Sequence, residues 1–173
     1  MAGMSIAITD AQVRAMLDQI ELALLPGSLV AFLEGDVQDY LAEQIEWRFA
    51  FEGDRASGDW DRLSEATVHI REQAGFMGDS PINERTGELL RYLTEHYDGR
   101  AIVGGAELQI PGDVSGTMED KIRHAQVGAQ PGENPLFPNS ETPPRPVLAL
   151  DEMDLEKVIE LLSLYIVGFV LIP

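Results

Sequence analysis

Three histidines and thirty carboxylates are the side chains that could carry acid–base or metal chemistry in this sequence of 173 residues. His69, His96 and His124 are far apart along the chain, and none belongs to an HExxH motif. His69 and Glu72 have a helical i, i+3 spacing, but such polar pairs are ordinary on helix surfaces. Cysteine is absent, which excludes disulfides and thiolate metal sites. These residues predict no metal site and no cofactor site.

Motifs for nucleophilic or phosphate chemistry are also missing. The acidic-glycine segments Glu34–Asp36 and Glu52–Asp54 lack the alternating oxygen ligands of a calcium loop. Gly104-Gly105 is not followed by the Lys-Ser/Thr of a phosphate loop, and the sequence contains no Gly-x-Ser-x-Gly. We therefore predict that the chain has no catalytic residues and is not an enzyme. A small acidic enzyme or regulator of unrelated origin stays open as an alternative.

The charge of the chain limits its partners. Twelve basic residues stand against thirty acidic ones, giving a net charge of −18. Proteins that bind nucleic acid tightly neutralise phosphates with Lys and Arg, so a sequence-reading DNA binder is not expected. An acidic surface keeps a protein soluble, and it also lets a polyanion pass nearby without adhering. Charge alone does not choose between these two roles.

Length and composition predict one globular domain over residues 1–173, with 45% apolar residues. No basic segment precedes an apolar run at the N-terminus, so no secretory signal is expected. The apolar run Leu161–Ile172 is shorter than the ~18–20 residues that cross a bilayer. We expect a buried or interface helix there, and no membrane partner.

The first fifty residues are expected to form a pair of helices. Thr9 and Gln12 have the spacing of a capping box, and Pro26-Gly27 stops the first helix. A second helical pattern runs from about Ser28 to Phe49, with Gly35 inside it. We expect the two helices to pack against each other. The apolar positions are Val13, Met16/Leu17, Ile20 and Leu24 in the first helix and Val30, Leu33, Val37, Leu41, Ile45 and Phe49 in the second.

Residues 51–150 contain shorter elements. Residues 52–59 are a predicted loop, Ser64 is a predicted N-cap with Gly75 ending its helix, and Leu89, Leu90 and Leu93 share the face of another helix. Arg100–Gly112 reads as a β-hairpin around Gly104-Gly105. Because an isolated hairpin is marginally stable, it needs a partner. The candidates are Ala125–Val127 and Val147–Ala149 of this chain, or an edge from a neighbouring subunit.

The chain ends with a stiff segment and a helix. Prolines make Pro143–Val147 extended, and Asp151, Glu152 and Asp154 place negative charge at the start of a helix over residues 151–173. The predicted class is therefore α+β. It is mainly helical, with a small antiparallel hairpin, a long proline-rich loop and a C-terminal amphipathic helix.

Four segments occur in an order that resembles a known family. They are "WDRLSEAT" (Trp60–Thr67), "RTGELLRYLT" (Arg85–Thr94), "IRHAQVGAQ" (Ile122–Gln130) and "PPRPVLALDEMDLEKVIELLSLYI" (Pro143–Ile166). Together they resemble the phage virion morphogenesis family, the tail-completion proteins of tailed phages, over about residues 48–166. The His124-x-x-x-Gly128 spacing has one residue more than the family's pattern, and residues 130–142 are richer in proline.

This resemblance implies a structural virion protein at the neck or the head-proximal end of the tail. Such a protein helps to join a finished tail to a filled capsid and is made in the host cytoplasm. The implied assembly is a six-fold ring around the DNA path, in which DNA passes but is not specifically bound. The implied partners are tail-terminator, tail-tube and head-closure or connector proteins. A tail terminator or head-closure protein is the alternative within the same neck.

The resemblance also gives roles to individual residues. Trp60 and Leu63 would anchor the approach to the short helix, and Thr86 would cap the helix beginning at Gly87. In the proline-rich segment before the last helix, Arg145 would be the polar anchor, because a guanidinium can fork onto carboxylates or carbonyls. Whether Arg145 binds a neighbour or its own subunit stays open. The remaining candidate contact residues are Leu136, Phe137, Pro144 and Pro146, within a segment, residues 130–146, that is expected to project from the subunit.

Overall fold

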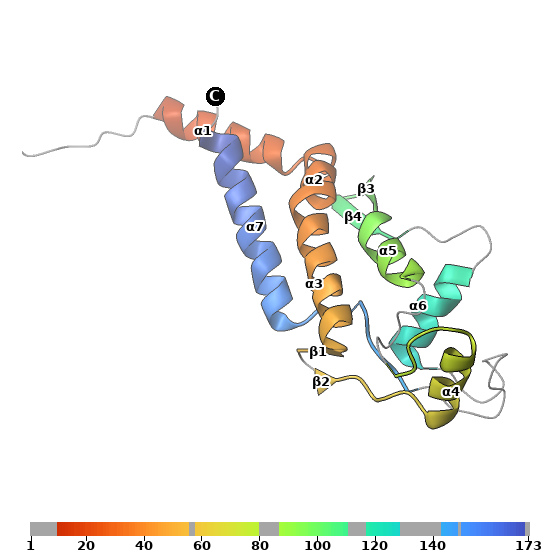
Figure 1. Ribbon diagram of the computed structural model, residues 1–173. Coiled ribbons are helices and arrows are strands. Elements are labelled where there is room, and N and C mark those ends of the chain that lie inside the picture. The colour runs from red at the N-terminus through yellow and green to blue at the C-terminus, as the bar shows by residue number, and fades with distance from the viewer. Residues whose placement is uncertain are drawn as a thin grey trace, which may run out of the picture.

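The computed structural model describes residues 10–55, 58–79, 87–110, 117–128, 143–148 and 150–171. Helices dominate these residues and the strands pair as two small antiparallel hairpins, so the predicted mainly helical α+β class is confirmed (Figure 1). The helices are α1 (Asp10–Ala23), α2 (Pro26–Phe32), the π-helix η1 (Leu33–Val37), α3 (Gln38–Phe51), α4 (Glu65–Gln73), α5 (Glu88–Glu95), α6 (Thr117–Val127) and α7 (Glu152–Leu171). The strands are β1 (Gly53–Asp54), β2 (Gly58–Asp59), β3 (Asp98–Ile102) and β4 (Gly105–Gln109).

One long helical segment, α2–η1–α3, forms the axis of the molecule. It begins with Pro26 at its first turn, where a missing N–H costs nothing. At Gly35 the winding loosens into one π-helical stretch, and α3 then continues to Phe51. The predicted inward positions Val37, Ile45 and Phe49 are buried, so the helical pattern over 28–49 is confirmed.

The expectation that the first two helices pack against each other is wrong. α1 turns away from the Pro26–Phe51 segment by 69° and instead crosses the C-terminal end of α7 (Figure 1). The cause is local. Pro26 forces Leu25 into an extended conformation, with φ −61° and ψ 144°, which redirects the chain between the two helices.

The hairpin β3–β4 packs beside α2 and η1 and pairs from Asp98↔Gln109 to Ile102↔Gly105. Gly104 has a φ of +84° in the connection, as a tight turn requires. The hairpin is also tied to η1, because the Gly99 N–H donates to the Glu34 carboxylate at 3.0 Å.

Of the partners proposed for this hairpin, Ala125–Val127 is wrong. These residues form the last turn of α6. Met118, Ile122 and Ala125 have helical spacing and turn one apolar face inward, and this packing decides for a helix. Val147 and Leu148 do not pair as a strand either, and Ala149 lies outside the described residues.

Two predicted helix ends are confirmed. The Ser64 hydroxyl accepts from the Thr67 N–H at 3.3 Å and caps α4. At the other end, Gly75 has a φ of +81°, and the Gly75 and Phe76 N–H groups donate to the Glu72 and Arg71 carbonyls. This pair of hydrogen bonds is a Schellman motif, and it requires a left-handed residue that glycine supplies without strain.

The core lies between α3, α5, α6 and the segment that precedes α7. Phe49 and Trp60 meet edge to face, with ring centroids 5.8 Å apart. The predicted helical face of Leu89, Leu90 and Leu93 packs on the same core. The buried members of this core are Ile45, Phe49, Trp60, Leu93, Ala125 and Val147.

Candidate functional site

The start of α7 is fixed by a reciprocal cap. The Asp154 N–H donates to Asp151 Oδ1 at 2.8 Å, and the Asp151 N–H donates to Asp154 Oδ2 at 3.1 Å. This is the arrangement of a capping box with aspartate at both positions. The negative charge predicted at the N-terminus of this helix is thus present and satisfies two backbone donors.

Asp154 also joins α7 to the central helix. Its side chain is 1% exposed and receives Arg48 Nη2 at 3.1 Å and the Tyr40 hydroxyl at 2.5 Å, both from α3. Burial, followed by the hydrogen bond to Asp154, raises the pKa of Tyr40 to about 12, so its phenol stays a donor. Because each buried charge here has a partner, this cluster locks α7 onto α3.

Arg145 is buried and binds within its own chain. Its Nε and Nη2 donate to the Asp61 carbonyl at 3.0 and 2.9 Å, and its backbone N–H donates to the Ala125 carbonyl at 2.6 Å. Burial lowers the pKa of Arg145, and the nearby Asp61 carboxylate opposes that shift. Of the two possibilities left open by the sequence, the structure places this side chain against its own subunit.

The neighbours of Arg145 divide into buried and exposed residues. Val147 is fully buried and donates its N–H to the side chain of Gln126 at 3.2 Å, whereas Pro144 is exposed and Pro146 half-buried. Trp60 is a member of the core, and Leu63 packs against that core. Both residues therefore take the anchoring positions that the sequence predicted. Residues 143–148, which include the described end of the segment 130–146, therefore lie along the body of the subunit.

Three predicted contact residues cannot be placed. Thr86, Leu136 and Phe137 lie outside the described residues, as does most of the segment 130–146. The helix that Thr86 was expected to cap begins at Glu88, with Gly87 at its N-cap position and a φ of +70°.

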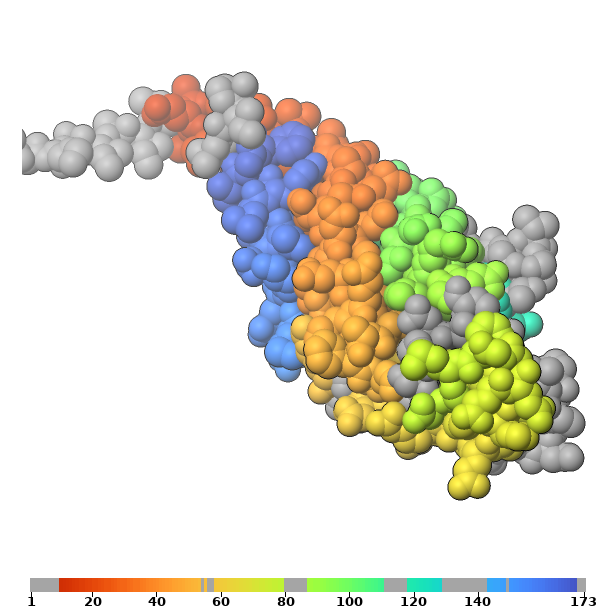
Figure 2. All heavy atoms as spheres, in the orientation of Figure 1, coloured from red at the N-terminus to blue at the C-terminus, as the bar shows by residue number. Residues whose placement is uncertain are grey.

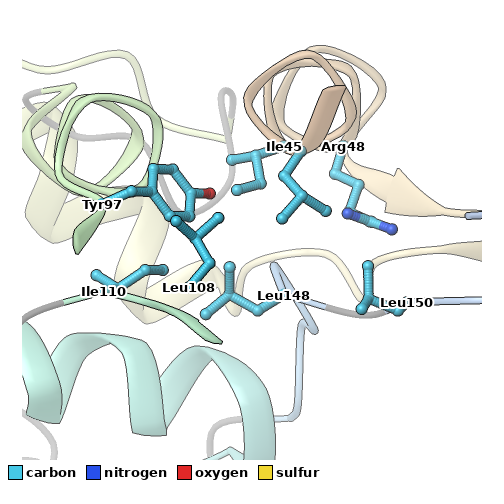
Figure 3. A pocket seen from close by; sticks show the side chains of 8 residues that line it. Ile45, Arg48, Tyr97, Leu108, Ile110, Leu148 and Leu150 are labelled. Carbon is cyan, nitrogen blue, oxygen red and sulfur yellow. The ribbon is translucent and has the colours of Figure 1, made fainter. Parts of the chain in front are cut away.

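A cavity of about 290 Å³ lies between α3, β4 and the segment before α7 (Figure 3). Its wall is mostly aliphatic, with Arg48 and Tyr97 as its polar members. The Tyr97 hydroxyl is buried and has no hydrogen-bond partner among the described residues. Burial raises the pKa of Tyr97 to about 12, so at neutral pH it can donate a hydrogen bond but cannot act as a base. The other lining residues are Leu41, Ile45, Leu108, Ile110, Leu148 and Leu150.

A second feature is the set of exposed apolar side chains on α1 and α7. In Figure 2, α7 follows one edge of the molecule and α1 lies across its upper end. On α1, Val13, Met16 and Leu17 share the predicted apolar face and are exposed. On α7, Leu155 and Ile159 are 53% and 64% exposed. Large apolar side chains exposed together usually mark a contact surface rather than free solvent.

The histidines do not converge. His69 contacts Gln73 at 2.9 Å, His96 stacks on Tyr92, and His124 lies beside Arg123. In the part of the chain that the structure describes, no three His, Asp or Glu side chains come together as metal ligands. No single described helix has the length and apolarity to cross a membrane; α1 with Pro26–Phe51 reaches both as a pair bent by 69°.

Sequence reasoning missed the cavity and the buried cluster at Asp154. The spacing Asp151-x-x-Asp154 was a signal for the cap, but nothing in the sequence links Asp154 to Arg48, 106 residues earlier. The apolar face of α7 that is partly exposed did leave a signal in the sequence. Leu155, Ile159, Leu162 and Ile166 are spaced by four, three and four residues, as in a helix that packs along another helix.

Comparison with known proteins gave no match: no family model, no curated protein and no solved structure is detectably similar to this chain.

Proposed function

We propose that the chain is a structural virion protein that assembles as a ring at the junction between a phage head and its tail. The observation that carries this proposal is the exposed apolar surface of α1 and α7 on a chain of charge −18. Such a surface needs a partner, and the acidic remainder excludes polyanions as that partner. The ordered segments between Trp60 and Ile166 that resemble tail-completion proteins supply the identity of the assembly.

The acidic surface has a role in this proposal. DNA that travels through a protein ring must not adhere to it, and carboxylates repel phosphates at short range. With a net charge of −18 on each subunit, the ring repels the DNA that passes through it. The buried cluster at Asp154 serves the same assembly indirectly, because it holds α7 in one orientation.

The proposal is tested by the mass of the purified chain in solution. Native mass spectrometry and light scattering should find closed oligomers, six copies of the 19.0 kDa chain for a six-fold ring, with rings visible by negative-stain electron microscopy. Binding to duplex DNA should be weak at physiological salt. A chain that stays monomeric and binds neither tail-tube nor connector protein contradicts the proposal.

The cavity favours a second candidate, a small regulator that binds an apolar ligand. The Tyr97 hydroxyl, which is buried and finds no hydrogen-bond partner in the described part of the chain, can donate to one acceptor atom on a mostly apolar ligand. A Tyr97→Phe variant separates the two candidates, because it removes this donor without touching α1 or α7. A wild-type chain that forms rings and binds no apolar probe supports the structural role. A monomeric wild-type chain that binds such a probe, with the binding lost in Tyr97→Phe, supports the regulator.

A further inference from the structure

We propose that the cavity between α3, β4 and the segment before α7 binds a neutral aliphatic molecule that carries one hydrogen-bond acceptor, such as a medium-chain ketone or ester. The inference rests on the second candidate function above and names the chemical class of its ligand. It needs no assembly, because the residues that line the cavity all belong to one chain.

The wall of the cavity selects an apolar occupant. All of its lining residues except Arg48 and Tyr97 are leucine or isoleucine (Figure 3). Water is a poor occupant of such a space, because a buried water molecule needs several polar partners, whereas an apolar cavity takes up apolar molecules that fit it. At roughly 30 Å³ for each non-hydrogen atom, the volume of about 290 Å³ holds about ten such atoms.

The Tyr97 hydroxyl adds one polar requirement. It is buried, points toward Ile45 and Leu108 in Figure 3, and finds no hydrogen-bond partner among the described residues. A buried donor without an acceptor costs free energy, and a ligand oxygen removes that cost. Burial raises the pKa of Tyr97 to about 12, so the phenol keeps its proton at neutral pH. The ligand therefore places a carbonyl or ester oxygen against Tyr97.

The ligand is neutral although a guanidinium lies in the wall. The side chain of Arg48 is 5% exposed, and the Asp154 carboxylate at 3.1 Å offsets its charge. A carboxylate ligand would share this arginine with Asp154, and two carboxylates that share one site repel each other. The net charge of −18 on the chain disfavours an anion further.

A side chain inserted by another protein would satisfy the cavity less well. The aliphatic side chains and phenylalanine end in carbon, so they offer no acceptor to Tyr97. The cavity opens beside Leu150, which is 54% exposed, and this opening gives a small molecule a way in. Since Leu108 belongs to β4 and Leu148 to the segment before α7, a bound molecule ties both to α3 and stabilises the fold.

The test uses the full-length chain and 2-octanone, a ketone of about the required size. Calorimetry should find one molecule bound to each chain, and the thermal midpoint should rise by roughly 5–10 °C at about one hundred times the Kd. Tyr97→Phe should weaken binding about five- to tenfold, because it removes one hydrogen bond, and should keep the circular dichroism of the wild type. The matched control is Tyr165→Phe, which removes a hydroxyl that donates to the Ser28 carbonyl outside the cavity and should bind as the wild type does.

Two further measurements separate the alternatives. Leu108→Trp fills the cavity and should abolish binding while circular dichroism shows a folded chain. Octanoate at pH 8 should bind at least about tenfold more weakly than 2-octanone, because its carboxylate meets the repulsion described above.

The outcomes distinguish the ligand class from the function on which it rests. Binding of 2-octanone that is unchanged in Tyr97→Phe, or exceeded by that of octanoate, refutes the ligand class and leaves a ligand site. A folded wild-type chain that binds none of these probes refutes the site and the second candidate together. The oligomer mass of the same samples judges the ring separately, so failure of the site leaves the structural role standing.

Discussion

The two faces of α7 are built in opposite ways. On the inner face, Asp154 binds Arg48 and Tyr40, and three turns later the Tyr165 hydroxyl donates to the Ser28 carbonyl at 2.8 Å. On the outer face, Leu155 and Ile159 meet no part of the chain that the structure describes closely enough to bury them.

The difference shows how a largely apolar helix can have one defined orientation. Asp154 and Tyr165 are eleven residues apart, so both lie on one line of the helix. Apolar contacts alone would let α7 rotate, because both of its faces carry aliphatic side chains. The two polar anchors remove that freedom, since rotation would leave the buried Arg48 without its carboxylate. Leu155 and Ile159 on the outer face are therefore held outward, where they are available to a partner.

Removing the stronger anchor should have the largest effect. Asp154→Ala leaves the Arg48 guanidinium buried without its carboxylate and breaks the cap of α7, so we expect a loss of about 3–5 kcal/mol in the free energy of unfolding. Urea unfolding followed by circular dichroism measures it. The matched control is Glu160→Ala on the exposed side of the same helix, where an ion pair with Lys157 at 2.9 Å is worth less than about 1 kcal/mol. Equal losses in both variants would contradict the comparison.

Arg145 extends the comparison to the segment that leads into α7. Arg145→Ala removes two hydrogen bonds to the Asp61 carbonyl, and bonds from a charged donor are worth about 1.5–3 kcal/mol. We expect a loss of about 2–3 kcal/mol in the free energy of unfolding, measured in the same way. Arg62→Ala is the control, because Arg62 is exposed and makes one long ion pair at 3.4 Å. If Arg145→Ala left stability unchanged while abolishing assembly, Arg145 would be an intersubunit anchor instead.

Structural features that depend on residues close together in the sequence could be predicted, and features that depend on distant contacts could not. Ser64, Gly75 and Gly104 act through hydrogen bonds and φ angles of their immediate neighbours, and their roles were predicted correctly. The helix at Ala125–Val127 was missed because three residues with alternating apolar and polar side chains fit a strand or a helix, and burial against the core decided between them.

The site depended on contacts that no local pattern encodes. Arg48 and Asp154 are 106 residues apart, and the cavity lining comes from α3, β4, the residues just before β3 and just after β4, and the segment before α7. For Arg145 the sequence predicted the chemistry, a forked polar anchor, but could not choose between a neighbouring subunit and its own. For α1 the apolar face was predicted correctly and its packing partner was not, because the bend at Pro26 decides where that face lies.

The stability of the folded chain should fall at alkaline pH because of Tyr40, which binds the inner face of α7. The pKa of Tyr40 is raised to about 12 in the folded chain against 10.0 for a free tyrosine, chiefly by burial and then by its bond to Asp154. The folded state thus keeps a proton that the unfolded state releases, and the stability that this provides is complete below pH 10 and lost as pH rises toward 12. Thermal unfolding midpoints should fall over that window, and fall less steeply in Tyr40→Phe. A residual slope is expected because Tyr97 is shifted in the same direction. Identical slopes for the two proteins would show that the pKa of Tyr40 is not raised in the folded chain.

The smallest effect on stability is expected at the outer face. Ile159 is 64% exposed, so Ile159→Gln removes little buried surface from the monomer and should change its free energy of unfolding by no more than about 0.5 kcal/mol. Glutamine is a good helix former, so α7 itself is not weakened. Val158, the preceding position of the same helix, is half-buried, and Val158→Ala should cost more than Ile159→Gln because it removes two partly buried methyl groups. Unfolding in urea at a protein concentration low enough to keep the chain monomeric makes the measurement. If Ile159→Gln proved the more damaging of the two, Ile159 would already be covered within the monomer, and the outer face of α7 would not be free to receive a partner.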